Sequence, residues 1–131
     1  MIGLDTNILV RYLAGDAPVQ SPRAAQIIEH QLAEEEPGFV SLGTMAETVW
    51  VLDRRYDATP MEIARYVERL LQTDTLYIQN EQEVYIAMTA LKAGVASFAD
   101  ALIGALGAWI GCSRTLTFDR KAARLKEFQY A

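Results

Sequence analysis

The sequence contains only one cysteine, Cys112, and one histidine, His30. A disulfide within the chain is therefore excluded, as are zinc sites built from cysteines and metal sites built from several histidines. The longest apolar run, Ala101–Cys112, is far shorter than the ~20 residues of a transmembrane helix. The N-terminus lacks the basic stretch of a signal peptide and meets Asp5 at once. We therefore expect a protein of the reducing cytoplasm without a membrane segment.

Positive charge is also scarce. The 131 residues include 12 Lys and Arg against 17 Asp and Glu, which gives a net charge of −5. An acidic surface generally disfavours nucleic-acid binding. The charge is uneven, however, because residues 112–131 carry +3 and the rest of the chain carries −8. The length and the 51% content of hydrophobic residues suit one globular domain over residues 1–131.

The apolar periodicity predicts short strands separated by helices. Strands are expected at Met1–Leu4, which has the pattern of a buried strand, and at Phe39–Ser41, Thr75–Gln79 and Arg114–Phe118. A last short helix is expected at Arg120–Glu127, and Thr59 and Glu62 are spaced as a capping box at the start of an earlier one. Strands separated by helices imply crossover connections and hence parallel pairing. We predict an α/β protein, a three-layer α/β/α domain with a small central parallel sheet of four or five strands.

Four acidic residues lie where a folded core would not need them. Asp5 and Asp119 directly follow predicted strands, whereas Glu47 and Asp100 lie in the first turns of predicted helices. In open parallel sheets, ligands bind beyond the carboxyl ends of the strands. We therefore expect all four carboxylates to converge on one rim of the sheet.

Helix capping offers a structural interpretation of each of these residues. Asp5 and Asp119 suit the N-cap position. Glu47 completes the capping-box spacing that begins at Thr44, and Asp100 completes a weaker one that begins at Ser97. Capping explains an acidic residue at a helix start, but it does not explain why acidic residues at strand ends and helix starts share one edge.

A cluster of four carboxylates has an electrostatic cost. Two carboxylates about 7 Å apart repel by roughly 2 kcal/mol at an effective dielectric constant of about 20. Such a cluster therefore favours a bound cation, or a raised pKa on some members. With no His or Cys nearby in the sequence, the ligands are hard oxygens, which suit Mg²⁺ or Mn²⁺. Acidic metal sites of this kind activate water against phosphodiesters.

These segments resemble the motifs of PIN-domain ribonucleases, and in particular those of the VapC-type toxins of bacterial toxin–antitoxin pairs. The resemblance covers nearly the whole chain in order. The segments that carry it are Met1–Leu9 with Asp5, Met45–Leu52 with Glu47, Ser97–Ile103 with Asp100, and Thr115–Asp119.

The resemblance implies Mg²⁺-dependent cleavage of RNA, with Mn²⁺ as a substitute metal. Asp5 and Asp100 would be the main metal ligands, and Glu47 would orient or activate water. Asp119 would complete the site directly or through water, and Thr117 would support it by hydrogen bonding. The resemblance also implies a small antitoxin protein as partner and a homodimer.

The C-terminal segment adds two expectations. Arg120, Lys121 and Arg124 adjoin Asp119, so they are candidates for contact with RNA phosphate, although solvated surface charge is the alternative interpretation. Family members often add a last strand after the final helix. Only three residues follow Phe128 here, so we expect that fifth strand to be missing or vestigial.

Three other functions fit parts of the pattern. A haloacid-dehalogenase-like phosphatase needs a second Asp two residues after Asp5, where this chain has Asn7. A receiver-like signalling domain needs a Lys after the last strand, where this chain has Asp119. A PIN-like module that binds a metal and partners without cleaving RNA retains all four acidic residues and stays open.

Overall fold

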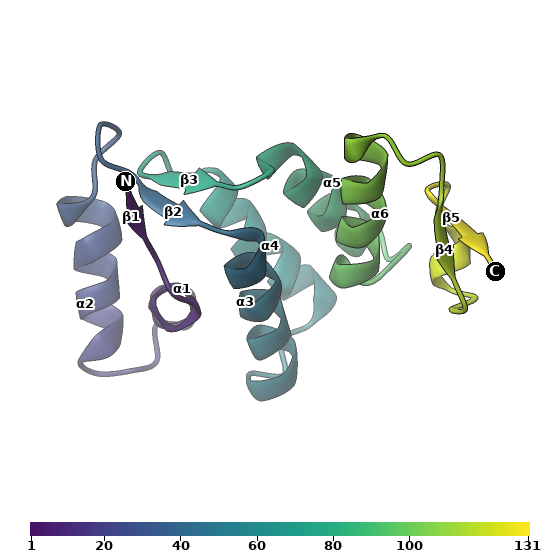
Figure 1. Ribbon diagram of the computed structural model, residues 1–131. Coiled ribbons are helices and arrows are strands. Elements are labelled where there is room, and N and C mark those ends of the chain that lie inside the picture. The colour runs from purple at the N-terminus through teal and green to yellow at the C-terminus, as the bar shows by residue number, and fades with distance from the viewer. The chain divides into compact units, whose positions relative to one another are not determined.

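The protein is described here by a computed structural model that covers residues 1–131 and consists of two compact units, Met1–Gln79 and Asn80–Ala131 (Figure 1). The first unit contains β1 (Ile2–Gly3), α1 (Thr6–Ala14), α2 (Gln20–Gln26), a π-helical turn (Ile27–Gln31), β2 (Gly38–Val40), α3 (Leu42–Arg55), α4 (Pro60–Leu71) and β3 (Leu76–Ile78). The second contains α5 (Glu81–Lys92), α6 (Phe98–Ile110), β4 (Thr115–Thr117), a 3₁₀ turn (Ala122–Arg124) and β5 (Phe128–Tyr130). The predicted α/β class with parallel strands is confirmed, whereas the single domain over the whole chain stays a prediction.

The sheet of the first unit has the order β1-β2-β3, and both pairs are parallel. Its register aligns Ile2 with Gly38 and Gly38 with Leu76, so the carboxyl ends of all three strands reach the same edge. Because β1 is an edge strand of this sheet, Ile2 is 39% exposed. The prediction of a buried first strand is therefore wrong.

The helices of the first unit bury one apolar face each. Helix α1 packs against α2 and α3, and α3 packs against α4. The fully buried side chains that fill the space between these elements include Leu9, Ile28, Met45, Leu52 and Leu70. No helix in the structure is both long enough and apolar enough to cross a membrane.

The capping box predicted at the start of α4 is confirmed. The Thr59 hydroxyl accepts a hydrogen bond from the Glu62 amide at 3.2 Å, and the Glu62 carboxylate accepts one from the Thr59 amide at 2.9 Å. The backbone hydrogen bond from Thr59 favours the charged form and holds the pKa of Glu62 below its ordinary value. Because the pKa is lowered on folding, this contribution to stability is present at neutral pH and is lost as the pH falls through the lowered pKa.

The second unit ends in a parallel pair of strands, β4 and β5, in which Thr115 aligns with Phe128 and Thr117 with Tyr130. The expectation that the fifth strand is missing or vestigial is therefore wrong, as is the helix expected at Arg120–Glu127, of which only one 3₁₀ turn forms. Leu125 leaves the helical region with φ −75° and ψ 141°. The backbone that follows then accepts a hydrogen bond from β4, since the Thr115 amide donates to the Glu127 carbonyl at 2.8 Å.

A glycine lets α6 lie close to β5. A Cβ atom added at Gly104 would lie 2.7 Å from Cε2 of Phe128 and 3.2 Å from Cβ of Glu127. In α3, by contrast, a Cβ atom added at Gly43 would meet only the Ser41 hydroxyl at 3.7 Å, an ordinary van der Waals distance. The two helical glycines therefore differ in whether a methyl group fits.

We predict opposite effects of alanine at these two positions. Gly104→Ala should lower the free energy of unfolding, because overpacking costs about 1–3 kcal/mol and outweighs the ~0.5–1 kcal/mol gained when alanine replaces a helical glycine. Gly43→Ala should gain that ~0.5–1 kcal/mol without the clash. Urea denaturation of both variants measures the difference, and an equal stabilisation would contradict the close packing of α6 against Phe128.

Candidate functional site

A pocket of about 780 Å³ lies in the first unit and contains two of the four predicted carboxylates. Its walls come from the start of α1, the loop that follows α1, and one face of α3. The lining residues are Asp5, Thr6, Asn7, Val10, Arg11, Asp16, Glu47, Trp50, Val51, Arg55 and Tyr56.

Asp5 connects β1 to α1. It is the N-cap of α1, and its Oδ1 accepts a hydrogen bond from the Thr6 amide at 2.7 Å. Its Oδ2 makes no hydrogen bond, and the residue is exposed. The capping interpretation therefore accounts for one oxygen of the Asp5 carboxylate and leaves the other available to a ligand.

Glu47 does not take part in a capping box. The N-cap of α3 is Ser41, whose hydroxyl accepts a hydrogen bond from the Thr44 amide at 3.1 Å. Because α3 starts three residues earlier than that box would require, the Glu47 carboxylate is not used at the helix start. Its Oε1 instead accepts a hydrogen bond from the hydroxyl of Thr6.

Thr6 is a site residue that the sequence reasoning did not identify. Its amide donates to Asp5 and its hydroxyl donates to Glu47, so one residue binds both carboxylates. Its side chain is buried, which limits the conformations of the hydroxyl. The only sequence signal is its place directly after Asp5, because the 41-residue separation from Glu47 gives no local pattern.

Asp100 lies in the first turn of α6, in the second unit. The Ser97 hydroxyl accepts a hydrogen bond from the Asp100 amide at 3.1 Å. The reciprocal bond of a capping box is absent, and the Asp100 carboxylate makes no hydrogen bond or ion pair within its unit. Capping therefore does not account for the charge of Asp100.

Asp119 follows β4 in the same unit. Its Oδ1 accepts hydrogen bonds from the amides of Lys121 at 2.8 Å and Ala122 at 3.3 Å, so it stabilises the turn that leads into the 3₁₀ turn. The hydroxyl of Thr117 accepts a hydrogen bond from the Asp119 amide at 2.9 Å. Thr117 thus fixes the backbone of the turn that carries Asp119.

The three basic residues that follow Asp119 are exposed. The Arg120 guanidinium lies over the ring of Tyr130, 4.4 Å from its centroid, and this cation–π contact holds it against β5. Lys121 and Arg124 make no ion pair within their unit. All three side chains are accessible to an anionic ligand.

The structure brings Asp5 and Glu47 to one pocket, whereas Asp100 and Asp119 belong to the other unit. In neither unit are three or more His, Cys, Asp or Glu side chains placed to hold a metal ion. The donor type nevertheless fits a hard divalent cation, since Asp5 and Glu47 each keep one carboxylate oxygen free of hydrogen bonds. The site of four carboxylates stays a prediction.

Comparison with known proteins decides the family. The PIN domain family matches residues 2–127. The chain belongs to the PIN domain family. PIN domains are generally nucleases that act on RNA and typically bind divalent metal ions. No curated protein matches the chain in sequence.

The match has a direct bearing on the candidate residues of this PIN domain. It extends over both compact units, so all four carboxylates and Thr6 lie within it. The haloacid-dehalogenase-like and receiver-like alternatives assumed other families, and the match removes their basis.

We predict that Thr6 and Glu47 are energetically coupled. Thr6→Val keeps the shape of the side chain but removes the donor to a carboxylate, and it should lower the free energy of unfolding by about 1–2 kcal/mol. In a double-mutant cycle with Glu47→Ala, which removes the acceptor, the coupling energy measured by urea denaturation should be about 1 kcal/mol. Thr6→Ser keeps the hydroxyl and is the control that should retain the coupling. Additive effects within ~0.3–0.5 kcal/mol would contradict the hydrogen bond.

Proposed function

We propose that this PIN domain is a Mg²⁺- or Mn²⁺-dependent endoribonuclease that hydrolyses RNA phosphodiesters as the toxin of a VapC-type toxin–antitoxin pair. In this proposal Asp5, Glu47, Asp100 and Asp119 act together, with Asp5 and Asp100 as the main metal ligands. The observation that carries it is the pocket in which Thr6 holds the carboxylates of Asp5 and Glu47, in a chain that belongs to a family of nucleases.

In the proposed chemistry, the metal ion and the side chains of the protein have different roles. When bound, a divalent ion lowers the pKa of a coordinated water and offsets the charge that develops on the phosphate. Glu47 orients the attacking water through its free oxygen, while Thr6 fixes its other oxygen. Asp119 completes the site, and Thr117 holds the turn that carries it.

The basic segment after Asp119 has a role in binding in this proposal. A polyanionic substrate needs local positive charge beside acidic residues, and residues 112–131 carry +3 in a chain of net charge −5. Arg120, Lys121 and Arg124 are exposed and contact RNA phosphates in this scheme.

Loss of one metal ligand tests the activity. Asp5→Asn is nearly isosteric and keeps an acceptor for the Thr6 amide, so the fold should survive. Cleavage of RNA in Mg²⁺ should fall at least about 100-fold, because loss of an outer-shell partner of a metal already costs 10–100-fold. Asp53→Asn is the control, since Asp53 lies outside the pocket and should leave cleavage unchanged. Equal rates in the parent and Asp5→Asn would refute the site.

Thermal denaturation of the same proteins separates catalysis from metal binding. At 100 times the dissociation constant, Mg²⁺ or Mn²⁺ should stabilise the parent by ~2.7 kcal/mol, and Asp5→Asn should lose much of that gain. A parent that is stabilised by the ion but cleaves no RNA would support the alternative, a non-catalytic module that binds a metal and partners.

We also propose a small antitoxin partner, a homodimeric state and a cytoplasmic location. An arginine of the partner would bind a carboxylate of the site in bidentate fashion and compete with the metal. The chain expressed with its neighbouring reading frame should therefore co-purify with a small protein, and inhibition should weaken as Mg²⁺ or salt increases. A bound partner that leaves RNA cleavage intact would exclude this mode of inhibition. Analytical ultracentrifugation tests the dimer.

A further inference from the structure

Besides Asp5 and Glu47, the pocket has a cationic and aromatic half, which consists of Arg11, Trp50, Arg55 and Tyr56. Arg11 comes from α1, whereas Trp50, Arg55 and Tyr56 come from α3 and its C-terminal end. None of these four side chains has a role in the chemistry proposed above. Their shared place in the pocket raises the question of what they bind.

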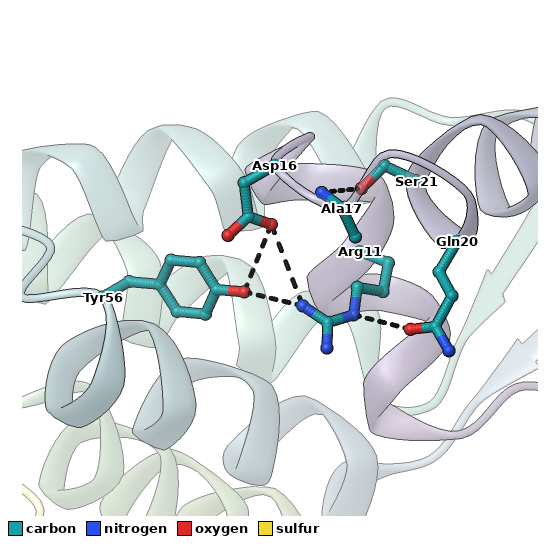
Figure 2. A network of polar contacts seen from close by, with 6 residues as sticks. All are labelled: Arg11, Asp16, Ala17, Gln20, Ser21 and Tyr56. Carbon is teal, nitrogen blue, oxygen red and sulfur yellow. Dashed lines mark hydrogen bonds and ion pairs between the residues drawn. The ribbon is translucent and has the colours of Figure 1, made fainter.

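Arg11 is held in place by a polar network (Figure 2). Its Nε donates to Oε1 of Gln20 at 2.9 Å, and its Nη1 donates to the Tyr56 hydroxyl at 3.2 Å and lies 3.9 Å from Oδ1 of Asp16. The Tyr56 hydroxyl in turn donates to Asp16 at 3.3 Å. Nη2 makes no hydrogen bond, so a pre-oriented guanidinium keeps one terminal nitrogen free for a ligand.

Two residues of α3 complete this half of the pocket. Trp50 is 51% exposed although it is the largest apolar side chain of α3, so one part of its indole remains open to a planar ligand. Arg55 makes no hydrogen bond or ion pair within its unit, whereas the adjacent Arg54 pairs with Asp53 at 3.5 Å and does not line the pocket. Arg55 is thus an unpaired cation at the same surface.

We propose that this half of the pocket binds one nucleotide of the RNA strand beside the bond to be cleaved. The base stacks on the indole of Trp50, and Arg11 and Arg55 donate hydrogen bonds to the phosphate. The proposal rests on the proposed function, since it takes RNA as the substrate. It adds the residues that hold the strand, which the carboxylates alone leave unspecified.

The charges of the pocket favour a polyanion once a metal is present. Asp5, Asp16 and Glu47 oppose Arg11 and Arg55, a net charge of −1. One divalent cation on the carboxylates would change this to +1, so affinity for RNA should increase with the ion. The apolar face of a partner helix fits less well, because only Val10, Val51 and the rings of Trp50 and Tyr56 offer large apolar surface among eleven lining residues.

Binding of a single-stranded 2′-O-methyl oligoribonucleotide tests the proposal without cleavage. The chain offers matched controls for two of the three proposed contacts: the exposed Trp109 for Trp50, and the paired Arg54 for Arg55. In Ca²⁺, Trp50→Ala should weaken binding about 5- to 150-fold, whereas Trp50→Phe should retain most of it and Trp109→Ala all of it. Arg55→Ala should reduce the salt slope of log K by about 0.7, and Arg54→Ala should not change it.

Fluorescence identifies the tryptophan that contacts the base. In a Trp109→Phe background, the oligoribonucleotide should quench the emission of Trp50, and removal of Ca²⁺ should weaken binding. Equal affinities of the Trp50→Ala and Trp109→Ala variants, or no binding to the parent, would overturn the proposal. The proposal would also be overturned if the Trp50→Ala variant lost a protein partner while its RNA affinity stayed at the parent value.

The outcome for cleavage is separate. RNA binding that depends on Trp50 and Arg55 in a protein without nuclease activity would refute the proposed function and leave the nucleotide site standing. The opposite result is RNA cleavage by the parent together with equal RNA affinities of the Trp50, Trp109, Arg54 and Arg55 alanine variants. It would support the proposed function and refute the nucleotide site.

Discussion

The parallel pairing of β1 with β2 is the constraint on which the pocket depends. The Ile2 amide donates to the Pro37 carbonyl at 2.9 Å and the Leu4 amide to the Phe39 carbonyl at 3.0 Å, which fixes the register. Both strands lead directly into helices, α1 through Asp5 and α3 through Ser41. Parallel strands place these helix starts at one edge, so residues 41 positions apart, such as Thr6 and Glu47, come within hydrogen-bond distance.

Helix α3 determines how the two halves of the pocket are spaced. Glu47, Val51 and Arg55 lie four residues apart and therefore follow one face of the helix. The Cα atoms of Glu47 and Arg55 are separated by about 12 Å along the axis, at a rise of about 1.5 Å per residue. In the proposed complex, a phosphate bound by Arg55 would therefore be a different group from the phosphate at Glu47. The helix repeat thus places the proposed phosphate contact of Arg55 about two turns away from the carboxylate of Glu47. This spacing would suit an extended RNA strand that occupies both positions better than a single nucleotide.

The features that could be predicted from the sequence are those that depend on residues close together in the chain. Apolar periodicity located the first four strands, and the Thr59–Glu62 spacing correctly predicted a capping box. The same spacing at Thr44 and Glu47 misled, because Ser41 takes the cap and the longer helix frees Glu47 for a contact with α1. The fifth strand was missed because its stability comes from pairing with β4, which no pattern within Phe128–Tyr130 encodes. The Thr6–Glu47 bond was missed for the same reason, since it is a tertiary contact.

The negative net charge of the chain bears on how the pocket could bind RNA. A protein with a net charge of −5 repels RNA at long range, and a pocket of net charge −1 does so locally. Arg11 and Arg55 do not overcome this alone, because Asp16 already offsets the charge of Arg11 at 3.9 Å. A divalent ion bound by Asp5 and Glu47 would change the net charge of the pocket from −1 to +1. The metal would then control substrate binding as well as chemistry, and an arginine of a partner placed on the carboxylates would supply charge without supplying a reactive water.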